Sequence, residues 1–217
     1  MPSMNRRSYN RIAPSWDEAR AAFGRERKYF EAFLEGVPIP SSFLDLGCGT
    51  GRPVAEHLLE LGHRVTGVDQ AERLLALARE RFPAGRWIEA RLEEYEPTAT
   101  YAGVICWDAL FHIPRERHEG ILARAAGCLE PGGRLVISVG GSAHPAFTDT
   151  MFGETFFYDS HPPEQAVEIL ASLGFEMRIA EFLNPPTSGR DKGRFAIVAS
   201  KGSTSSAAVR GRRPVPE

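Results

Sequence analysis

Apolar residues along the chain fall into two kinds of segment, short continuous runs and longer stretches with helical spacing. The runs predict strands at 42–46, 64–68, 86–90, 102–107, 133–139, 175–182 and 194–200, and the helical spacing predicts helices at 52–61, 71–81, 115–128 and 163–173. Strands that alternate with helices are typical of parallel sheets, because each crossover helix packs back onto the sheet. The pattern therefore predicts a doubly wound α/β fold with a mostly parallel sheet.

The segment before the first strand has a helical pattern of its own. Large apolar side chains from Trp16 to Leu34 recur at helical spacing, and Ser15 is a suitable N-cap. We expect one helix over residues 15–36, so that residues 1–36 form an N-terminal lid on a main domain at 37–200. After Lys201 the composition is rich in Gly, Ser, Arg and Pro, which bury little apolar area, and residues 201–217 are expected to be disordered.

Composition narrows the function classes. The 217 residues suit one domain, and a formal net charge of −2 gives no field that attracts nucleic acid or an anionic membrane. The three cysteines, Cys48, Cys106 and Cys128, show no metal-binding or disulfide spacing, and no apolar run is long enough for a signal peptide or a membrane span. We expect a cytoplasmic protein without a metal, since the spacing of Asp108, Asp149, Asp159 and His161 matches no metal signature.

A glycine turn between the first strand and the next helix carries the main functional signal. It reads Leu-Asp-Leu-Gly-Cys-Gly-Thr-Gly over residues 44–51, and Asp69 ends the following strand. Alternate glycines permit positive φ angles and let a ligand approach the main chain closely. A carboxylate at the end of the second strand can accept both hydroxyls of a ribose. These features predict a site for a nucleoside-containing cofactor at the carboxyl edge of the sheet.

The glycine spacing separates two classes of cofactor. Dinucleotide sites have G-x-G-x-x-G, whereas this chain has G-x-G-x-G and places Arg52 at the position of the third dinucleotide glycine. With Asp45, the motif resembles motif I of the class I S-adenosylmethionine-dependent methyltransferases. The Pro-Gly-Gly at 131–133 resembles the turn before the fifth strand of that family. The resemblance covers about residues 9–200 and implies a Rossmann-like, seven-stranded sheet whose last strand runs antiparallel between its neighbours.

By the same resemblance the cofactor is S-adenosylmethionine, with S-adenosylhomocysteine as product. The implied cofactor-binding residues are Tyr9, Trp16, Asp45, Gly47, Cys48, Gly49, Gly51, Arg52, Asp69, Gln70, Leu92, Glu93, Trp107 and His112. Tyr9 and Trp16 would act as a lid, and Arg25 is a candidate clamp for a carboxylate. One departure concerns the adenine: the family carries an Asp where this chain has Arg91, which cannot accept a hydrogen bond. Adenine recognition is therefore expected at the backbone around Leu92 or at Glu93.

Residues 104–113 resemble the family's fourth strand and the loop that follows it. They place His112 at the carboxyl edge, where it is either a general base or a structural histidine. Asp108 would orient His112, meet a substrate amine or cap the loop. Tyr158 completes the set of candidate catalytic residues.

Residues 141–163 form a predicted long loop that is rich in aromatic residues, and loops of this length are usually functional. In the family, an insertion at this place covers the methyl acceptor, which implies a partly apolar small molecule here; a hydrophobic edge for dimerisation is the alternative. We expect methyl transfer to O, N or C of a small molecule by a monomer or homodimer, without nucleic-acid or membrane partners. A protein or RNA methyltransferase and a non-catalytic S-adenosylmethionine-binding protein remain the competing hypotheses.

Overall fold

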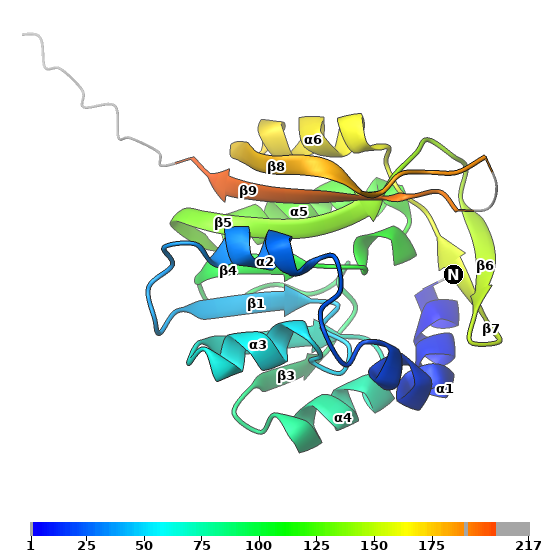
Figure 1. The fold of residues 1–217 in the computed structure, drawn as a ribbon, viewed down its shortest axis with the longest axis horizontal. Helices are drawn as coiled ribbons and strands as arrows, with labels where there is room; N and C mark the ends of the chain where they lie inside the picture. Colours follow the sequence, from blue (N-terminus) through cyan, green and yellow to red (C-terminus); the bar gives the residue numbers. More distant parts are fainter. Residues whose placement is uncertain (1, 189–190, 203–217) are drawn as a thin grey trace, which may run out of the picture.

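A computed structural model describes residues 2–188 and 191–202, and the predicted disordered tail lies outside these residues from position 203 onward. Within them, seven strands form one sheet in the order β3-β2-β1-β4-β5-β9-β8 (Figure 1). The strands are β1 (Ser42–Leu46), β2 (Arg64–Asp69), β3 (Arg86–Glu89), β4 (Tyr101–Cys106), β5 (Leu129–Gly140), β8 (Phe175–Asn184) and β9 (Arg194–Lys201). Strands β1 to β5 are parallel, and β9 runs antiparallel between β5 and β8. The predicted fold class, including the antiparallel last strand, is confirmed.

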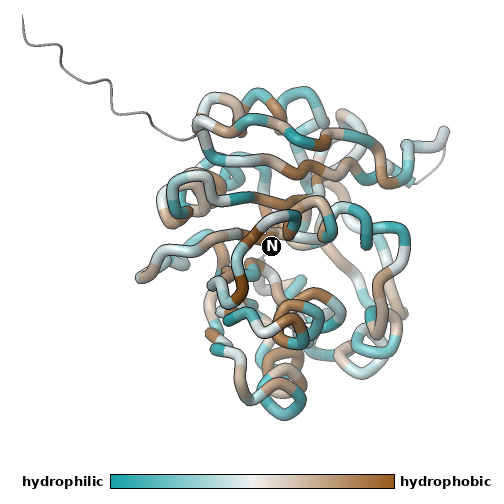
Figure 2. The backbone as a smooth tube through the Cα atoms, turned by 60° about the vertical axis from the view of Figure 1, so that its left-hand side comes forward, coloured by the Kyte–Doolittle hydropathy of each residue, from teal (hydrophilic) through white to brown (hydrophobic). Residues whose placement is uncertain are grey.

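Helices cover both faces of this sheet. They are α2 (Arg27–Leu34), α3 (Val54–Glu60), α4 (Glu72–Arg81), α5 (His118–Gly127) and α6 (Pro163–Ser172), with short 3₁₀ turns at Leu110–His112 and Arg115–Arg117. Because side chains alternate along a strand, Phe43 of β1 packs with α2 and α3, and its neighbour Leu44 packs with α5 and α6. The hydrophobic stretches of the chain lie mainly toward the middle of the molecule (Figure 2). Two apolar layers thus hold the sheet and fix its carboxyl edge.

The predicted single helix over residues 15–36 is wrong. The chain forms α1 (Pro2–Ala19), a turn, and then α2. The turn contains Gly24, and Arg20 places its side chain 3.3 Å from Glu26 and 3.6 Å from Asp108. Tertiary contacts of this kind override the helical spacing of the apolar residues. The break allows α1 to leave the face of the sheet and lie across its carboxyl edge (Figure 1).

The predicted long loop at 141–163 contains a β-hairpin, so the loop prediction is corrected here. Its strands are β6 (Phe147–Met151) and β7 (Glu154–Tyr158), joined by Phe152 and Gly153, which both have positive φ angles of 50° and 79°. Two positive φ angles are what a two-residue hairpin turn requires. The hairpin packs against α1 at the edge of the sheet (Figure 1). No helix within the described ranges is long and apolar enough to cross a membrane.

Candidate active site

The glycine turn passes over the end of β2 and leads into α3. The backbone N–H groups of Gly47 and Cys48 both donate to the carbonyl of Val68, at 2.8 Å and 3.1 Å. Gly47 has a φ angle of 81°, and a Cβ at this position would come within 2.3 Å of the Cβ of Ala109. Only glycine fits such a conformation in such a space. The turn therefore exposes bare backbone at the carboxyl edge of β1.

Asp69 joins this turn to the start of α4. Its carboxylate accepts hydrogen bonds from the backbone N–H groups of Gly49 at 3.0 Å and Ala71 at 2.8 Å. Burial raises the pKa of Asp69, and the backbone N–H groups around it lower that pKa. Each carboxylate oxygen accepts one of these two bonds and has a second lone pair, so both oxygens retain capacity to accept a hydrogen bond from a ligand. The sequence predicted that the turn and this carboxylate lie together, and they do.

A single cleft of about 800 Å³, counted with the solvent at its mouth, lies above the turn. The predicted cofactor residues that line it are Tyr9, Trp16, Asp45, Gly47, Cys48, Gly49, Arg52, Asp69, Gln70, Leu92, Glu93, Trp107 and His112. Gly51 does not line the cleft. A Cβ at this position would point away from the cleft and lie 3.0 Å from Phe82 and 3.1 Å from Trp87. Arg20 and Asp108 do line it, whereas Arg25 does not.

Two buried polar groups in the cleft, the Asp45 carboxylate and the Trp107 indole N–H, have no hydrogen-bond partner among the described residues. Asp45 is 4% exposed, and it forms no hydrogen bond or ion pair with any described residue. Burial, with Asp69 nearby, raises the pKa of Asp45 to about 7. Trp107 is 6% exposed, and its indole Nε1–H has no acceptor among the described residues. Buried polar groups are normally paired, so an unpaired carboxylate and an unpaired donor in one cleft call for a ligand.

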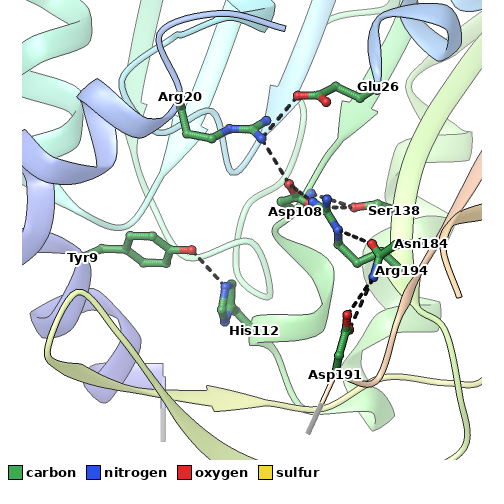
Figure 3. A network of polar contacts seen from close by, with 9 residues as sticks. All are labelled: Tyr9, Arg20, Glu26, Asp108, His112, Ser138, Asn184, Asp191 and Arg194. Carbon is green, nitrogen blue, oxygen red and sulfur yellow. Dashed lines mark hydrogen bonds and ion pairs between the residues drawn. The ribbon is translucent and has the colours of Figure 1, made fainter. Parts of the chain in front are cut away.

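His112 is held between Tyr9 and β7 (Figure 3). Its Nδ1–H donates to the carbonyl of Phe157 at 3.0 Å, which leaves Nε2 to accept from the Tyr9 hydroxyl at 2.9 Å. Burial lowers the pKa of His112 to about 4, so the imidazole is neutral near pH 7. The basic nitrogen of this candidate base is therefore occupied by the hydroxyl of Tyr9.

Asp108 forms no hydrogen bond with His112. Its carboxylate accepts from Arg194 Nη1 at 2.8 Å and 3.0 Å and from the Ser138 hydroxyl at 3.1 Å, and it lies 3.6 Å from Arg20 (Figure 3). Asp108 also has a φ angle of 50°, a left-handed conformation that is uncommon outside glycine. The Asp108 carboxylate thus connects Arg20, in the turn between α1 and α2, to Arg194, at the start of β9.

Tyr158 lies on the other side of His112, with ring centroids 4.7 Å apart. Together with Phe111, Phe147 and Arg194, it lines a second cavity of about 670 Å³. Burial raises the pKa of Tyr158. His112, which lines the cleft, thus lies against Tyr158, which lines the second cavity.

Two further predictions concern Arg91 at the rim of the cleft and the binding of a metal ion. Arg91 does not line it and instead pairs with Glu93 at 3.0 Å and Glu94 at 2.8 Å, while Leu92 and Glu93 face the cleft. Among the described residues, no group of three or more His, Cys, Asp or Glu side chains has an arrangement that suits a metal ion.

Comparison with known proteins agrees with this geometry. Residues 43–133 match a family model described as a methyltransferase domain, which spans the glycine turn, Asp69 and Asp108. These residues are thus similar to the methyltransferase domains that this family model describes. The chain is 30% identical over 135 residues to a ubiquinone biosynthesis O-methyltransferase of Xanthomonas axonopodis pv. citri (strain 306), covering 59% of this chain and 54% of the relative. It is 33% identical over 104 residues to a trans-aconitate 2-methyltransferase of Acidovorax sp. (strain JS42), covering 47% and 39%. The chain thus spans about half the length, or less, of these relatives.

Solved structures extend the likeness in fold over nearly the whole chain. One is a 1,6-didemethyltoxoflavin-N1-methyltransferase of Burkholderia thailandensis, with a TM-score of 0.69 and 23% identity over 92% of this chain and 88% of that one. Another is a magnesium protoporphyrin IX methyltransferase of Synechocystis PCC 6803, with a TM-score of 0.68 and 18% identity over 93% and 100%. At these identities the likeness shows the fold.

Proposed function

We propose that this chain is an enzyme that transfers the methyl group of S-adenosylmethionine to a small-molecule acceptor. The observation that carries the proposal is the Asp69 carboxylate, held by Gly49 and Ala71 in a cleft that also contains the unpaired groups of Asp45 and Trp107. The two solved methyltransferases of the same fold contain S-adenosylhomocysteine, which supports the same cofactor here. When bound, S-adenosylmethionine supplies a methyl group on a sulfonium that is already activated.

The residues of the cleft divide among the parts of this cofactor. Asp69 would accept the ribose hydroxyls, and Gln70, Leu92 and Glu93 would line the adenine. The backbone of the glycine turn would hold the amino-acid part together with Asp45. Tyr9 and Trp16, whose rings meet edge to face at 5.4 Å, would cover the cleft from α1. Aromatic faces suit a sulfonium because their π electrons attract a cation.

In this proposal the acceptor occupies the second cavity, beside Phe111 and Tyr158. A separate cavity next to the cofactor cleft favours an enzyme over a non-catalytic binding protein. Methyl transfer from a sulfonium depends mainly on alignment, so the protein's main task is to fix the two reactants. His112 would receive the acceptor's proton at Nε2 after the Tyr9 hydroxyl leaves it, and Tyr158 would contact the acceptor.

The acceptor atom is O, N or C, and the same proposal includes a monomer or homodimer in the cytoplasm without nucleic-acid or membrane partners. The relatives named above are described as acting on ubiquinone precursors, trans-aconitate, a toxoflavin precursor and a porphyrin, which are small molecules. All three cysteines are free thiols, in keeping with a reducing compartment.

Calorimetric titration tests the cofactor. S-adenosylhomocysteine should bind and NADH should not. Asp69→Ala should weaken S-adenosylhomocysteine binding by about 1–3 kcal/mol, since hydrogen bonds to a charged group are lost. Glu176→Ala, at an exposed carboxylate of β8 that lines neither the cleft nor the second cavity, is the control and should bind normally. Binding of NADH in place of S-adenosylhomocysteine would reject the proposal, and unchanged affinity in Asp69→Ala would remove Asp69 from the site.

A further inference from the structure

Three half-buried rings form one wall of the second cavity. Phe111 lies in the 3₁₀ turn after β4, and Phe147 and Tyr158 face each other across the β6–β7 hairpin. The Tyr158 ring is nearly parallel to that of Phe147, with an interplanar angle of 16° and centroids 5.3 Å apart, and it stacks on Phe111 at 6.2 Å. Parallel rings present flat apolar surfaces, on which another planar ring makes more contact than a branched aliphatic group does. We therefore expect a planar aromatic ligand at this wall.

Arg194 lies at the same cavity with part of its guanidinium unused. Its Nη1 donates to the two oxygens of Asp108 at 3.0 Å and 2.8 Å, and its Nε donates to the side-chain oxygen of Asn184 at 3.1 Å (Figure 3). The Nη2 atom forms no hydrogen bond with any described residue, and the side chain is 38% exposed. Two partners thus fix the plane of the guanidinium, while Nη2 retains two N–H donors for a ligand.

Lys192 adds a second cation to the cavity. Its half-buried side chain lines the cavity, and its ammonium forms no hydrogen bond or ion pair with any described residue. The carboxylates that line the cavity already accept hydrogen bonds from protein groups; they belong to Asp149, Asp159 and Asp191. The unused groups of the cavity are therefore charged donors, which favour an anionic ligand.

The same residues connect the cavity to the cofactor cleft. Asp108, the partner of Arg194, lines the cleft, and so does His112, whose ring centroid lies 4.7 Å from that of Tyr158. A ligand that contacts both Arg194 and Tyr158 therefore lies along the side of the cavity that adjoins the cleft. This is the position that a methyl acceptor requires.

We propose that the second cavity binds an aromatic carboxylate as the methyl acceptor. Its ring stacks on the wall formed by Phe111, Phe147 and Tyr158, and its carboxylate accepts hydrogen bonds from Arg194 Nη2 and Lys192 Nζ. Two separate donors suit the two oxygens of a carboxylate. The inference rests on the proposed function and deepens it, because it gives the acceptor a chemical class and names two residues that determine specificity.

Three probes separate the ring from the charge, each titrated into the protein saturated with S-adenosylhomocysteine. The first, 6-hydroxy-2-naphthoate, has both features. The second, 6-hydroxy-2-naphthamide, keeps the rings and loses the charge, and the third, adamantane-1-carboxylate, keeps the charge and loses the flat rings. The naphthoate should bind about tenfold more tightly than either of the others, because only the naphthoate both stacks and makes charge-assisted hydrogen bonds.

Variants of the two cations test the carboxylate contacts. Arg194→Gln and Lys192→Ala should each weaken naphthoate binding about tenfold and change naphthamide binding less than about twofold. Lys192→Ala removes no contact with a described residue, so it remains the test if Arg194→Gln does not fold. The matched control is Lys28→Ala, at an exposed lysine of α2 that pairs with Glu181 and lines neither the cleft nor the cavity. It should leave all three affinities unchanged.

Phe147→Leu tests the aromatic wall. It replaces a ring with a branched aliphatic side chain, so both naphthalene probes should bind more weakly by a similar factor of about three to ten. Binding of adamantane-1-carboxylate should change less than about twofold. Equal losses for all three probes would show that Phe147 supports the shape of the cavity without stacking on a ligand.

The outcomes distinguish this inference from the proposed function. If the wild-type protein does not bind S-adenosylhomocysteine, the proposed function fails and the inference fails with it. If it binds S-adenosylhomocysteine but none of the three probes, or binds the naphthoate and the naphthamide equally, the cofactor site stands and the anion site is rejected. Equal affinities for the naphthoate and adamantane-1-carboxylate would reject the stacking of the acceptor, and equal affinities in Lys192→Ala and Lys28→Ala would reject the role of Lys192.

Discussion

Asp45 is a carboxylate that is 4% exposed and forms no hydrogen bond or ion pair with any described residue. Its pKa is raised to about 7 by burial and by the nearby Asp69, so it is half protonated near neutral pH. An ammonium group binds only the ionised form. A ligand with an amino-acid end must therefore displace a proton from Asp45 below pH 7, and its affinity falls as the pH falls.

This coupling predicts that S-adenosylhomocysteine binds about tenfold more weakly at pH 6 than at pH 8, because the ionised fraction of a carboxyl group with a pKa of about 7 falls about tenfold between these two pH values. Calorimetry at several pH values measures the effect. Asp45→Asn should bind more weakly and lose the pH dependence over this range. Binding of 5′-methylthioadenosine, which lacks the ammonium, should stay level in both proteins. A level curve for S-adenosylhomocysteine in the wild-type protein would contradict the assignment.

Residue-level prediction from the sequence succeeded where a motif fixes the geometry. The glycine turn and Asp69 were predictable because the spacing itself requires a tight turn beside a strand end. Arg20 was missed because its place in the cleft depends on a break between α1 and α2 that the apolar spacing does not reveal. The partners of Asp108 were missed for a similar reason, since Arg194 is distant in sequence and joins Asp108 only when β9 inserts beside β5.

At the scale of elements, α1 bridges the two ends of the cleft. On one side, Asn5 donates to the carbonyls of His112 and Phe157, each at 3.0 Å, and accepts from the N–H of Phe157 at 2.8 Å. On the other side, Asp17 forms a two-point pair with Arg81 of α4 at 2.7 Å and 2.8 Å. Because α1 carries Tyr9 and Trp16, the order of this helix and the shape of the cleft depend on these contacts.

Asn5→Ala should destabilise the protein by about 2–4 kcal/mol, because it leaves the buried N–H of Phe157 and the carbonyl of His112 unpaired, whereas the carbonyl of Phe157 keeps its bond from His112 Nδ1. Urea unfolding measures the loss, and hydrogen exchange should show faster opening in α1 and the β6–β7 hairpin than in β1 and β4. Arg11→Ala is the control: it removes an exposed pair with Glu154 between the same elements and should cost less than about 0.5 kcal/mol. Equal losses in the two variants would mean that Asn5 does not fix the helix.

Some helices and strands could be predicted from the sequence, and others could not. The parallel strands were predictable because buried strands read as continuous apolar runs and alternate with amphipathic helices. The hairpin was missed because β6 and β7 are short and half exposed, so their apolar pattern is weak, although Phe152-Gly153 marks a turn. The course of α1 was missed because its packing against α4 and β7 decides where the helix lies.

For the whole molecule, buried ionisable groups give opposing contributions to the pH dependence of folding. Raised pKa values of Asp45 and Asp69 favour the folded state at low pH. Burial lowers the pKa values of His112 and His118 to about 4, which favours the folded state at high pH. The net curve does not identify any one of these groups. A variant at a single ionisable position outside the cleft isolates the contribution of that one group.

His118 is the suitable position, because it is 1% exposed, donates to the carbonyl of Ile113 at 2.8 Å and does not line the cleft. In the unfolded chain His118 binds a proton below about pH 6.5, whereas in the folded protein its pKa is about 4. The contribution of the neutral His118 ring to stability is therefore present above pH 6.5 and is lost as the pH falls toward 4. Between pH 7 and pH 4.5, wild-type protein should lose about 2 kcal/mol more free energy of unfolding than His118→Gln, which retains a donor without a titrating ring. Urea unfolding at both pH values measures the difference, and parallel curves for the two proteins would show that His118 is protonated equally in the folded and unfolded states.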